Sequence, residues 1–358
     1  SQYAISTWQT ADGLPMNSVL AMAQAADGSL WLGTEEGLVR FDGAEFEVRD
    51  RGNTPSMDAH NVQALCADED GNVWAGTYGA GLLRWDGRRF SRPAMDPEPE
   101  RSRPIRALAR GPDGSIWIGT AGGLERLVDG RRTRFAADPG LASAAVLAIS
   151  PGRKGRLWVA TVSWLGVVEN GELRRFVAEP APVGIALSLA EGPDGTLFVG
   201  TDQGLFRVSP DLRTCERIRG LANEFVSALV VDRNGALWAG TNGGLHRVGT
   251  DGRIERLTAA DGLSTDMIQT LLLDRDGNLW FGTRGGGLGR LRDGDVVTYG
   301  GAREGFVVDT VLAARLGGVF VGGWNGFLAR LGPGGRFEPL VSPAALGGSS
   351  IRALYEER

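Results

Sequence analysis

Asp276-Gly277-Asn278-Leu279-Trp280-Phe281-Gly282-Thr283 is the stretch that decides the fold, because the chain repeats it. Its other copies end in Trp31-Leu32-Gly33-Thr34, Trp74-Ala75-Gly76-Thr77, Trp117-Ile118-Gly119-Thr120, Trp158-Val159-Ala160-Thr161, Phe198-Val199-Gly200-Thr201, Trp238-Ala239-Gly240-Thr241 and the more divergent Phe320-Val321-Gly322-Gly323. Successive lead aromatics lie 40 to 43 residues apart. One motif in each regular period indicates a repeat architecture.

Each repeat has the pattern of four short strands. The first begins at an apolar anchor twelve residues before the lead aromatic, such as Val19 or Ile268, and ends at an invariant turn glycine such as Gly277. We expect a two-residue type I′ hairpin loop there, because Asp-Gly and Asn-Gly supply its positive φ angles. The aromatic lies on the second strand, and Gly-Leu pairs and a further glycine turn mark the third and fourth.

Four antiparallel strands in about 41 residues, without a helical segment, predict a blade of an all-β β-propeller. Eight motifs favour eight blades, with a seven-bladed ring as the alternative. We predict one propeller domain over residues 1–358. Residues 4–14 match an outer strand and its exit, so the N-terminus is expected to complete a blade from elsewhere in the chain. Residues 351–355 fit the first strand of a ninth repeat, which suggests a piece of a longer protein.

Composition narrows the function classes. The formal net charge is −5, which gives no overall case for binding nucleic acid or an anionic membrane. The longest apolar runs are too short to cross a bilayer. The 38 basic residues include only one lysine, Lys154, which we attribute mainly to codon bias. Cys66 and Cys215 are expected on separate strands and unpaired.

The line from Ile268 to Leu288, and that from Val62 to Leu82, resembles the two-component regulator propeller repeat: Val-x-x-Leu-x-x-Asp-x-Asp-Gly-Asn-Leu-Trp-x-Gly-Thr-x-x-Gly-Gly-Leu. The resemblance covers nearly the whole chain and departs at Lys154, Ala160, Phe198 and Gly323. It implies a periplasmic, non-enzymatic sensor region of an inner-membrane receptor. A histidine kinase or diguanylate cyclase would act as its output module, and no motif of either occurs in this chain.

Propellers bind at loops near the axis, and here the loops between second and third strands vary while their flanks are constant. We predict a ligand surface from Trp164, Trp324, Asn325, Tyr78, Arg284, Glu35 and, before an inner strand on the same face, His60. An aromatic platform flanked by polar groups suits a small molecule or glycan. The alternative is that both tryptophans only pack on neighbouring loops or on a domain outside this chain. Other receptor domains and a second copy of the chain are the further expected partners.

Catalytic and metal sites are not indicated, and no cofactor is expected. His60 and His246 are the only histidines, and ordinary packing is the preferred interpretation. The Asp-Gly-x-Trp-Phe pattern also resembles streptogramin lyase propellers, which pair a histidine base with a carboxylate-bound Mg²⁺. An arginine group (Arg88, Arg89, Arg92, Arg101, Arg103, Arg106) is interpreted as a solvated loop in preference to an anion site. A structural protein-interaction propeller and a lyase-like enzyme are thus the alternatives to a sensor.

Overall fold

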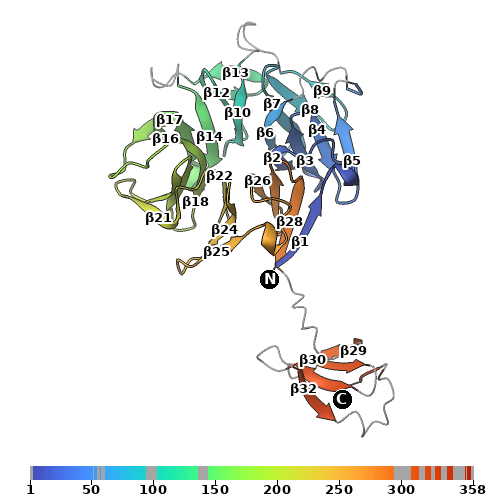
Figure 1. Cartoon of the computed structure of the whole chain (residues 1–358). Coiled ribbons are helices and arrows are strands. Elements are labelled where there is room, and N and C mark those ends of the chain that lie inside the picture. The colour runs from blue at the N-terminus through green and yellow to red at the C-terminus, as the bar shows by residue number, and fades with distance from the viewer. Residues whose placement is uncertain are drawn as a thin grey trace. The chain divides into compact units, whose positions relative to one another are not determined.

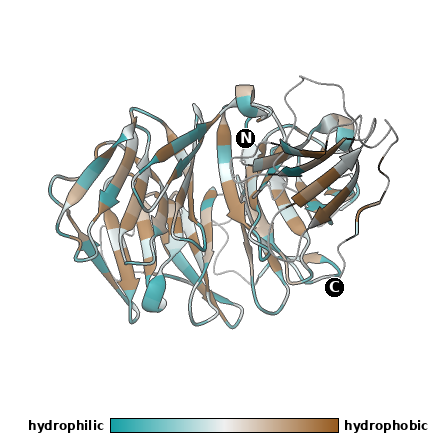
Figure 2. Cartoon of the chain, turned by 90° about the horizontal axis from the view of Figure 1, so that it is seen from below, coloured by the Kyte–Doolittle hydropathy of each residue, from teal (hydrophilic) through white to brown (hydrophobic). Residues whose placement is uncertain are grey.

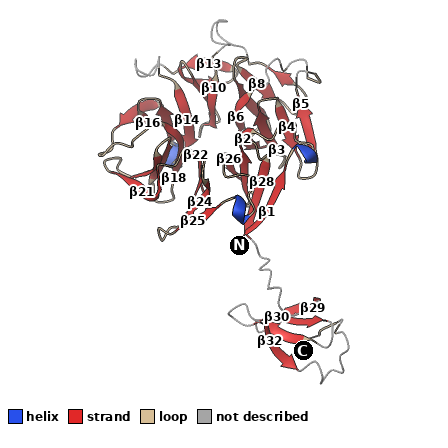
Figure 3. Ribbon diagram, viewed as in Figure 1, coloured by secondary structure: helices blue, strands red, loops and turns tan. Residues whose placement is uncertain are grey.

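The computed structural model describes residues 3–50, 52–54, 57, 61–93, 103–135, 144–293, 308–313, 319–323, 327–331, 337–341, 351 and 353–355. It divides the chain into two compact units, Tyr3–Asp293 and Gly294–Arg358, where the sequence predicted one domain. The described residues form strands and three short 3-10 turns, η1 (Thr10–Asp12), η3 (Arg153–Gly155) and η4 (Ala259–Asp261) (Figure 3). In this part of the chain no helix is long and apolar enough to cross a membrane. The all-β prediction is confirmed.

The first unit consists of seven four-stranded antiparallel sheets, numbered here as blades 1 to 7. Blades 1 to 3 are β2 (Val19–Gln24), β3 (Leu30–Thr34), β4 (Leu38–Phe41) and β5 (Phe46–Arg49); β6 (Val62–Ala67), β7 (Val73–Thr77), β8 (Leu82–Trp85) and β9 (Phe90–Ser91); and β10 (Ile105–Arg110), β11 (Ile116–Thr120), β12 (Gly123–Val128) and β13 (Arg131–Arg134). Blades 4 and 5 are β14 (Val146–Pro151), β15 (Leu157–Thr161), β16 (Leu165–Glu169) and β17 (Glu172–Phe176); and β18 (Ala186–Glu191), β19 (Leu197–Thr201), β20 (Gly204–Val208) and β21 (Cys215–Ala222). Blades 6 and 7 are β22 (Val226–Val231), β23 (Leu237–Thr241), β24 (Gly244–Val248) and β25 (Ile254–Leu257); and β26 (Ile268–Leu273), β27 (Leu279–Thr283), β28 (Leu288–Asp293) and β1 (Tyr3–Trp8).

These seven blades close a ring. The inner strands β2, β6, β10, β14, β18, β22 and β26 each pack beside the next, and β26 packs beside β2 (Figure 1). β1 pairs with β28 from Tyr3–Asp293 to Trp8–Leu288, so the N-terminus supplies the outer strand of blade 7 as predicted. The eight four-stranded repeats are confirmed, but the preference for eight blades in the ring is corrected to the seven-bladed alternative. Blade 7 already contacts blade 1, which leaves no place for an eighth blade between them.

The eighth repeat forms the sheet of the second unit. Its strands are β29 (Val308–Ala313), β30 (Val319–Gly323), β31 (Leu328–Leu331) and β32 (Phe337–Val341). Ile351 packs over Gly322 in this unit, and its amide donates to the Gly323 carbonyl at 3.1 Å. Ile351 therefore has the packing of a repeat anchor, although described residues 351 and 353–355 form no strand.

The hairpin between the first two strands of each blade is larger than predicted. In blade 7 the Asp274 amide donates to the Asn278 carbonyl at 3.0 Å, and the Gly277 amide donates to the Asp274 carbonyl at 3.1 Å. Gly277 has a φ of 88°, whereas no positive φ occurs at Asp276. A type I′ loop needs two residues with positive φ, so this prediction is wrong. The loop spans three residues, because the Asp274 carboxylate also accepts the amides of Asp276 and Asn278.

The lead aromatics fill the spaces between blades, as predicted, and apolar residues follow the strands in Figure 2. Trp31 and Trp158 are among the largest fully buried side chains. The arginine directly opposite a lead tryptophan on the third strand covers its ring in several blades. The guanidinium-to-centroid distances are 5.6 Å (Arg84–Trp74), 5.3 Å (Arg126–Trp117), 5.8 Å (Arg247–Trp238) and 5.1 Å (Arg290–Trp280). These arginines thus have a structural role, because the planar guanidinium stacks on aromatic rings.

Candidate functional site

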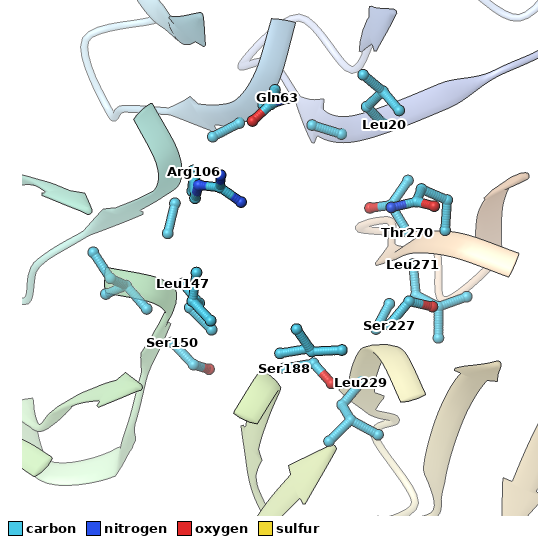
Figure 4. Close-up of a pocket in the computed structure, with 18 of the residues that line it drawn as sticks. Leu20, Gln63, Arg106, Leu147, Ser150, Ser188, Ser227, Leu229, Thr270 and Leu271 are labelled. Atoms are coloured by element: carbon cyan, nitrogen blue, oxygen red, sulfur yellow. The ribbon is translucent and has the colours of Figure 1, made fainter. Parts of the chain in front are cut away.

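A cavity of about 530 Å³ occupies the centre of the ring and receives side chains from all seven inner strands (Figure 4). Its volume lies in the range of roughly 300–1,000 Å³ typical of small-molecule sites. The lining residues form three levels along the axis, and two of these levels consist of small or apolar side chains. The small level is Ala21, Ala64, Ala107, Ala148, Ser188, Ala228 and Thr270, and the larger apolar level is Met22, Leu65, Leu108, Ile149, Leu189, Leu229 and Leu271.

The third level, which we call the mouth, is formed by the residue directly after each anchor. The mouth residues are Leu20, Gln63, Arg106, Leu147, Leu187, Ser227 and Gln269. Every inner strand has a register irregularity here: Val19 pairs with Thr34 and Ala21 with Gly33, so Leu20 has no partner residue. A bulge of this kind leaves one residue outside the ladder and re-aims its side chain. The strand can therefore change this side chain without changing its pairing.

The mouth lies at the same end of the blades as the loops between second and third strands, because Val19 pairs with Thr34 at that end. The threonines close these loops, which differ in length, by the same pair of hydrogen bonds. Thr34 Oγ1 donates to the Gly37 carbonyl at 3.0 Å and Thr283 Oγ1 to the Gly287 carbonyl at 2.8 Å. The same hydroxyls accept backbone amides, that of Glu36 in blade 1 and that of Gly286 in blade 7. A rigid frame with variable side chains is suited to selective binding.

The polar mouth residues differ in whether their hydrogen-bonding groups are already used within the protein. Ser227 Oγ donates to the Ile268 carbonyl at 2.6 Å and is therefore occupied within the protein. Gln63 and Gln269 also line the cavity, and their side-chain amides make no hydrogen bond to any described residue. Arg106 is the one charged residue among the described residues that line the cavity, and it forms no ion pair with them.

The predicted loop residues lie at this end of the ring but do not line the cavity. Glu35, Tyr78 and Arg284 are exposed on blades 1, 2 and 7, which are neighbours, whereas Trp164 lies on blade 4. His60, Trp324 and Asn325 lie outside the described residues. The structure thus groups three of the seven residues on adjacent blades, and their contact with a ligand stays a prediction.

Trp164 has a packing role of its own. It is half-buried against the apolar cluster between blades 3 and 4, which includes Trp117 and Val146. The Arg175 guanidinium lies 4.6 Å from its ring centroid and covers one face. This arrangement is the alternative that the sequence left open, in which the tryptophan packs on its neighbours.

His246 lies inside β24 with 2% of its surface exposed and does not line the cavity. Burial is the main cause that lowers the pKa of its imidazole, although Glu224 acts in the opposite direction. The ring is therefore neutral near pH 7. Among the described residues no group of three or more His, Cys, Asp or Glu side chains could hold a metal ion.

The sequence missed the mouth residues, although a signal was present. The position after each anchor varies between apolar, amide, hydroxyl and cationic side chains while its neighbours stay constant. The interpretation of the arginine group needs a correction for Arg106, which lies on β10 and points into the cavity beside Gln63 (Figure 4). Arg88 and Arg89 are exposed in the turn after β8, as expected for a solvated loop.

The family profile described as "Two component regulator propeller" matches residues 13–36, 56–79, 99–122, 220–243 and 262–285. The matches fall in blades 1, 2, 3, 6 and 7, each covering the mouth residue and the hairpin. Blades 4 and 5, which carry Lys154, Ala160 and Phe198, fall outside the matches. No curated protein sequence matches the chain.

Several solved structures share the fold at low identity. The extracellular domain of the putative hybrid two component system BT3049 from B. thetaiotaomicron is 20% identical with a TM-score of 0.71, covering 95% of this chain and 50% of that one. PorZ, a surface component of the type-IX secretion system of Porphyromonas gingivalis, is 18% identical with a TM-score of 0.64, covering 95% and 57%. Virginiamycin B lyase from Staphylococcus aureus is 17% identical with a TM-score of 0.63, covering 81% and 98%. The present chain thus spans about half the length of the BT3049 domain.

Proposed function

Because the chain belongs to the two component regulator propeller family, we propose that it is a non-enzymatic, ligand-binding sensor domain of a bacterial signal-transduction receptor. The observation that carries the proposal is the mouth of the ring. Seven blades with one common frame place seven different combinations of side chain and loop around one cavity. A frame shared by all blades, with a different lining side chain on each, is suited to selective binding of one ligand.

The location and the output are further parts of the proposal. The similarity to an extracellular domain of a hybrid two component system supports a periplasmic position in an inner-membrane receptor. Binding at the mouth would favour one of two arrangements of the receptor and so pass the signal to a histidine kinase or a diguanylate cyclase. The partners are then a small molecule or glycan, the other domains of the receptor and a second copy of the chain.

Two alternatives make different predictions. A lyase-like enzyme is favoured by the fold of virginiamycin B lyase, but it needs a histidine base at the cavity. His246 is buried inside blade 6, so His60 would have to supply the base, and replacing His60 would abolish turnover. A structural interaction propeller would bind no small molecule at the mouth.

The test is a thermal-shift screen of sugars, amino acids and organic acids against the parent and two variants. Leu187→Trp places a large ring at the half-buried mouth, and Val177→Trp makes a similar change at a residue that is 75% exposed on the outside of blade 4. We expect at least one compound to stabilise the parent and Val177→Trp but not Leu187→Trp. If no compound stabilises the parent, or if Leu187→Trp responds like the parent, the mouth is not the binding site.

A further inference from the structure

Arg106 gives the cavity a single, defined charge. Its guanidinium carries one positive charge. It projects from β10 into a channel whose other described lining residues are neutral (Figure 4). The apolar walls of this channel weaken the screening by solvent, so this cation attracts an anion more strongly than an arginine on an open surface.

The neighbours of Arg106 define two kinds of contact. On one side, Gln63 of blade 2 presents an amide without a side-chain partner among the described residues. On the other side, Leu147 of blade 4 and then Leu187 of blade 5 form an apolar arc of the mouth. Phe225, which precedes β22 and is 39% exposed, continues this arc toward blade 6.

We infer that the mouth binds a small monocarboxylic acid with an apolar body, an inference that rests on the proposed function and gives its ligand a chemical class. Arg106 binds the carboxylate through two parallel N–H···O bonds, the geometry that a guanidinium fork favours. The Gln63 amide donates to the same group. The apolar body of the acid lies against Leu147, Leu187 and Phe225 and extends toward the larger apolar level of the cavity wall.

The charge balance selects a monoanion. One guanidinium neutralises one carboxylate, and no second cation among the described lining residues would stabilise a phosphate dianion. On the described loops between second and third strands, Glu35, Glu36 and Asp202 outnumber the one cation, Arg284, and so oppose polyanions.

The experiment compares benzoate with benzamide, a neutral compound of nearly the same shape. Binding is measured by saturation-transfer NMR and calorimetry for the parent, Arg106→Gln and Arg253→Gln. The control removes the same charge at an arginine whose side chain is 88% exposed. We expect benzoate to bind the parent and Arg253→Gln about tenfold more tightly than benzamide, the effect of one charge-assisted contact. Arg106→Gln should lose this preference, and circular dichroism should show that it is folded.

Three results would overturn the inference: no saturation transfer to benzoate at millimolar concentration, equal binding of benzoate by Arg106→Gln and the parent, or tighter binding of phenyl phosphate than of benzoate. Failure of this kind differs from failure of the sensor proposal. If a neutral compound from the screen is blocked by Leu187→Trp while acids do not bind, the carboxylate assignment falls and the sensor proposal stands.

Discussion

The two ends of the inner strands, the hairpin end and the mouth, differ in how much they vary from blade to blade. At the hairpin end, Asp68, Asp232 and Asp274 of three blades all accept the indole N–H of their own lead tryptophan, at 2.8, 3.2 and 2.8 Å. At the mouth, a few residues earlier on the same strands, the corresponding positions are Gln63, Ser227 and Gln269 in these blades and Arg106 in a fourth. In the other four blades the equivalent positions are Ala25, Gly111, Gly152 and Gly192, but the turn glycine has a positive φ in all seven. The hairpin end therefore keeps one backbone turn throughout, whereas the mouth changes its side-chain chemistry from blade to blade.

The difference has a physical cause. In the three blades that carry it, the hairpin-end carboxylate satisfies several donors at once, so its removal there would leave buried N–H groups without acceptors. The mouth residue is bulged, has no partner across the sheet and faces the cavity. Few packing constraints act on it, so function can select its side chain.

At the seams, where the second strand of one blade packs against the anchor of the next, the sizes of the two facing residues compensate each other. A methyl group on Gly33 would lie 2.9 Å from Cγ1 of Val62 in the next blade, and one on Gly240 would lie 2.6 Å from Cγ2 of Ile268. Blade 4 has Ala160 at this position, and the facing anchor of blade 5 is Ala186. The departure of the fourth repeat is thus a small-for-large exchange that preserves the seam.

The largest effect is expected at the hairpin end. Asp274→Ala removes the acceptor of the Trp280 indole, the Asn278 side chain and two backbone amides. We expect the free energy of unfolding to fall by about 3 kcal/mol, the upper part of the range for buried donors left unsatisfied. Urea denaturation followed by tryptophan fluorescence measures it. Asp276→Ala, an exposed acid of the same loop, is the control and should cost far less.

The same pair of variants has a defined pH dependence. Burial tends to raise the pKa of Asp274, but the hydrogen bonds from Asn278, Trp280 and the backbone outweigh it and hold the pKa below its ordinary value of 3.8. A lowered folded-state pKa stabilises the protein above the unfolded-state pKa. The stability difference between parent and Asp274→Ala should therefore be constant near neutral pH and shrink as the pH falls below 3.8. A difference that grows in acid would contradict the role of the carboxylate.

An intermediate effect is expected at the seam. Ala186→Val adds the branched side chain that other anchors carry, but here it meets the methyl group of Ala160. We expect a loss of about 2 kcal/mol, as for an overpacked core. Adding Ala160→Gly should restore most of it, because the double variant reproduces the glycine and β-branched pair of the other seams. A double-mutant cycle measures the coupling, and additive losses would show that the two positions do not compensate.

The sequence predicted some parts of the structure better than others, depending on whether a position repeats from blade to blade. The period, the four strands of each repeat and the outer strand from Tyr3–Trp8 were readable, because hairpin and seam positions repeat their chemistry. The number of blades in the ring could not be predicted, because ring closure depends on the angle between neighbouring blades, and no single repeat encodes that angle. The candidate site was predicted in the variable loops, but Arg106 was missed because its position appears as variation inside a strand. Trp164 was singled out because an aromatic in a loop appears free, whereas Arg175 and the cluster of blades 3 and 4 cover it.

The smallest effect on stability is expected at the mouth, and it is the sharpest test of the comparison. Arg106 is exposed to the cavity, forms no ion pair with the described residues and occupies a bulged position. Arg106→Gln should change the free energy of unfolding by no more than about 0.5 kcal/mol, as for surface positions outside any network. The measurement is the same urea titration used for Asp274→Ala. A loss of unfolding free energy as large as that of Asp274→Ala would mean that Arg106 stabilises the ring. It would contradict the view that few packing constraints act on the mouth residues. A negligible loss, together with a lost preference for benzoate, would separate binding from folding at one residue.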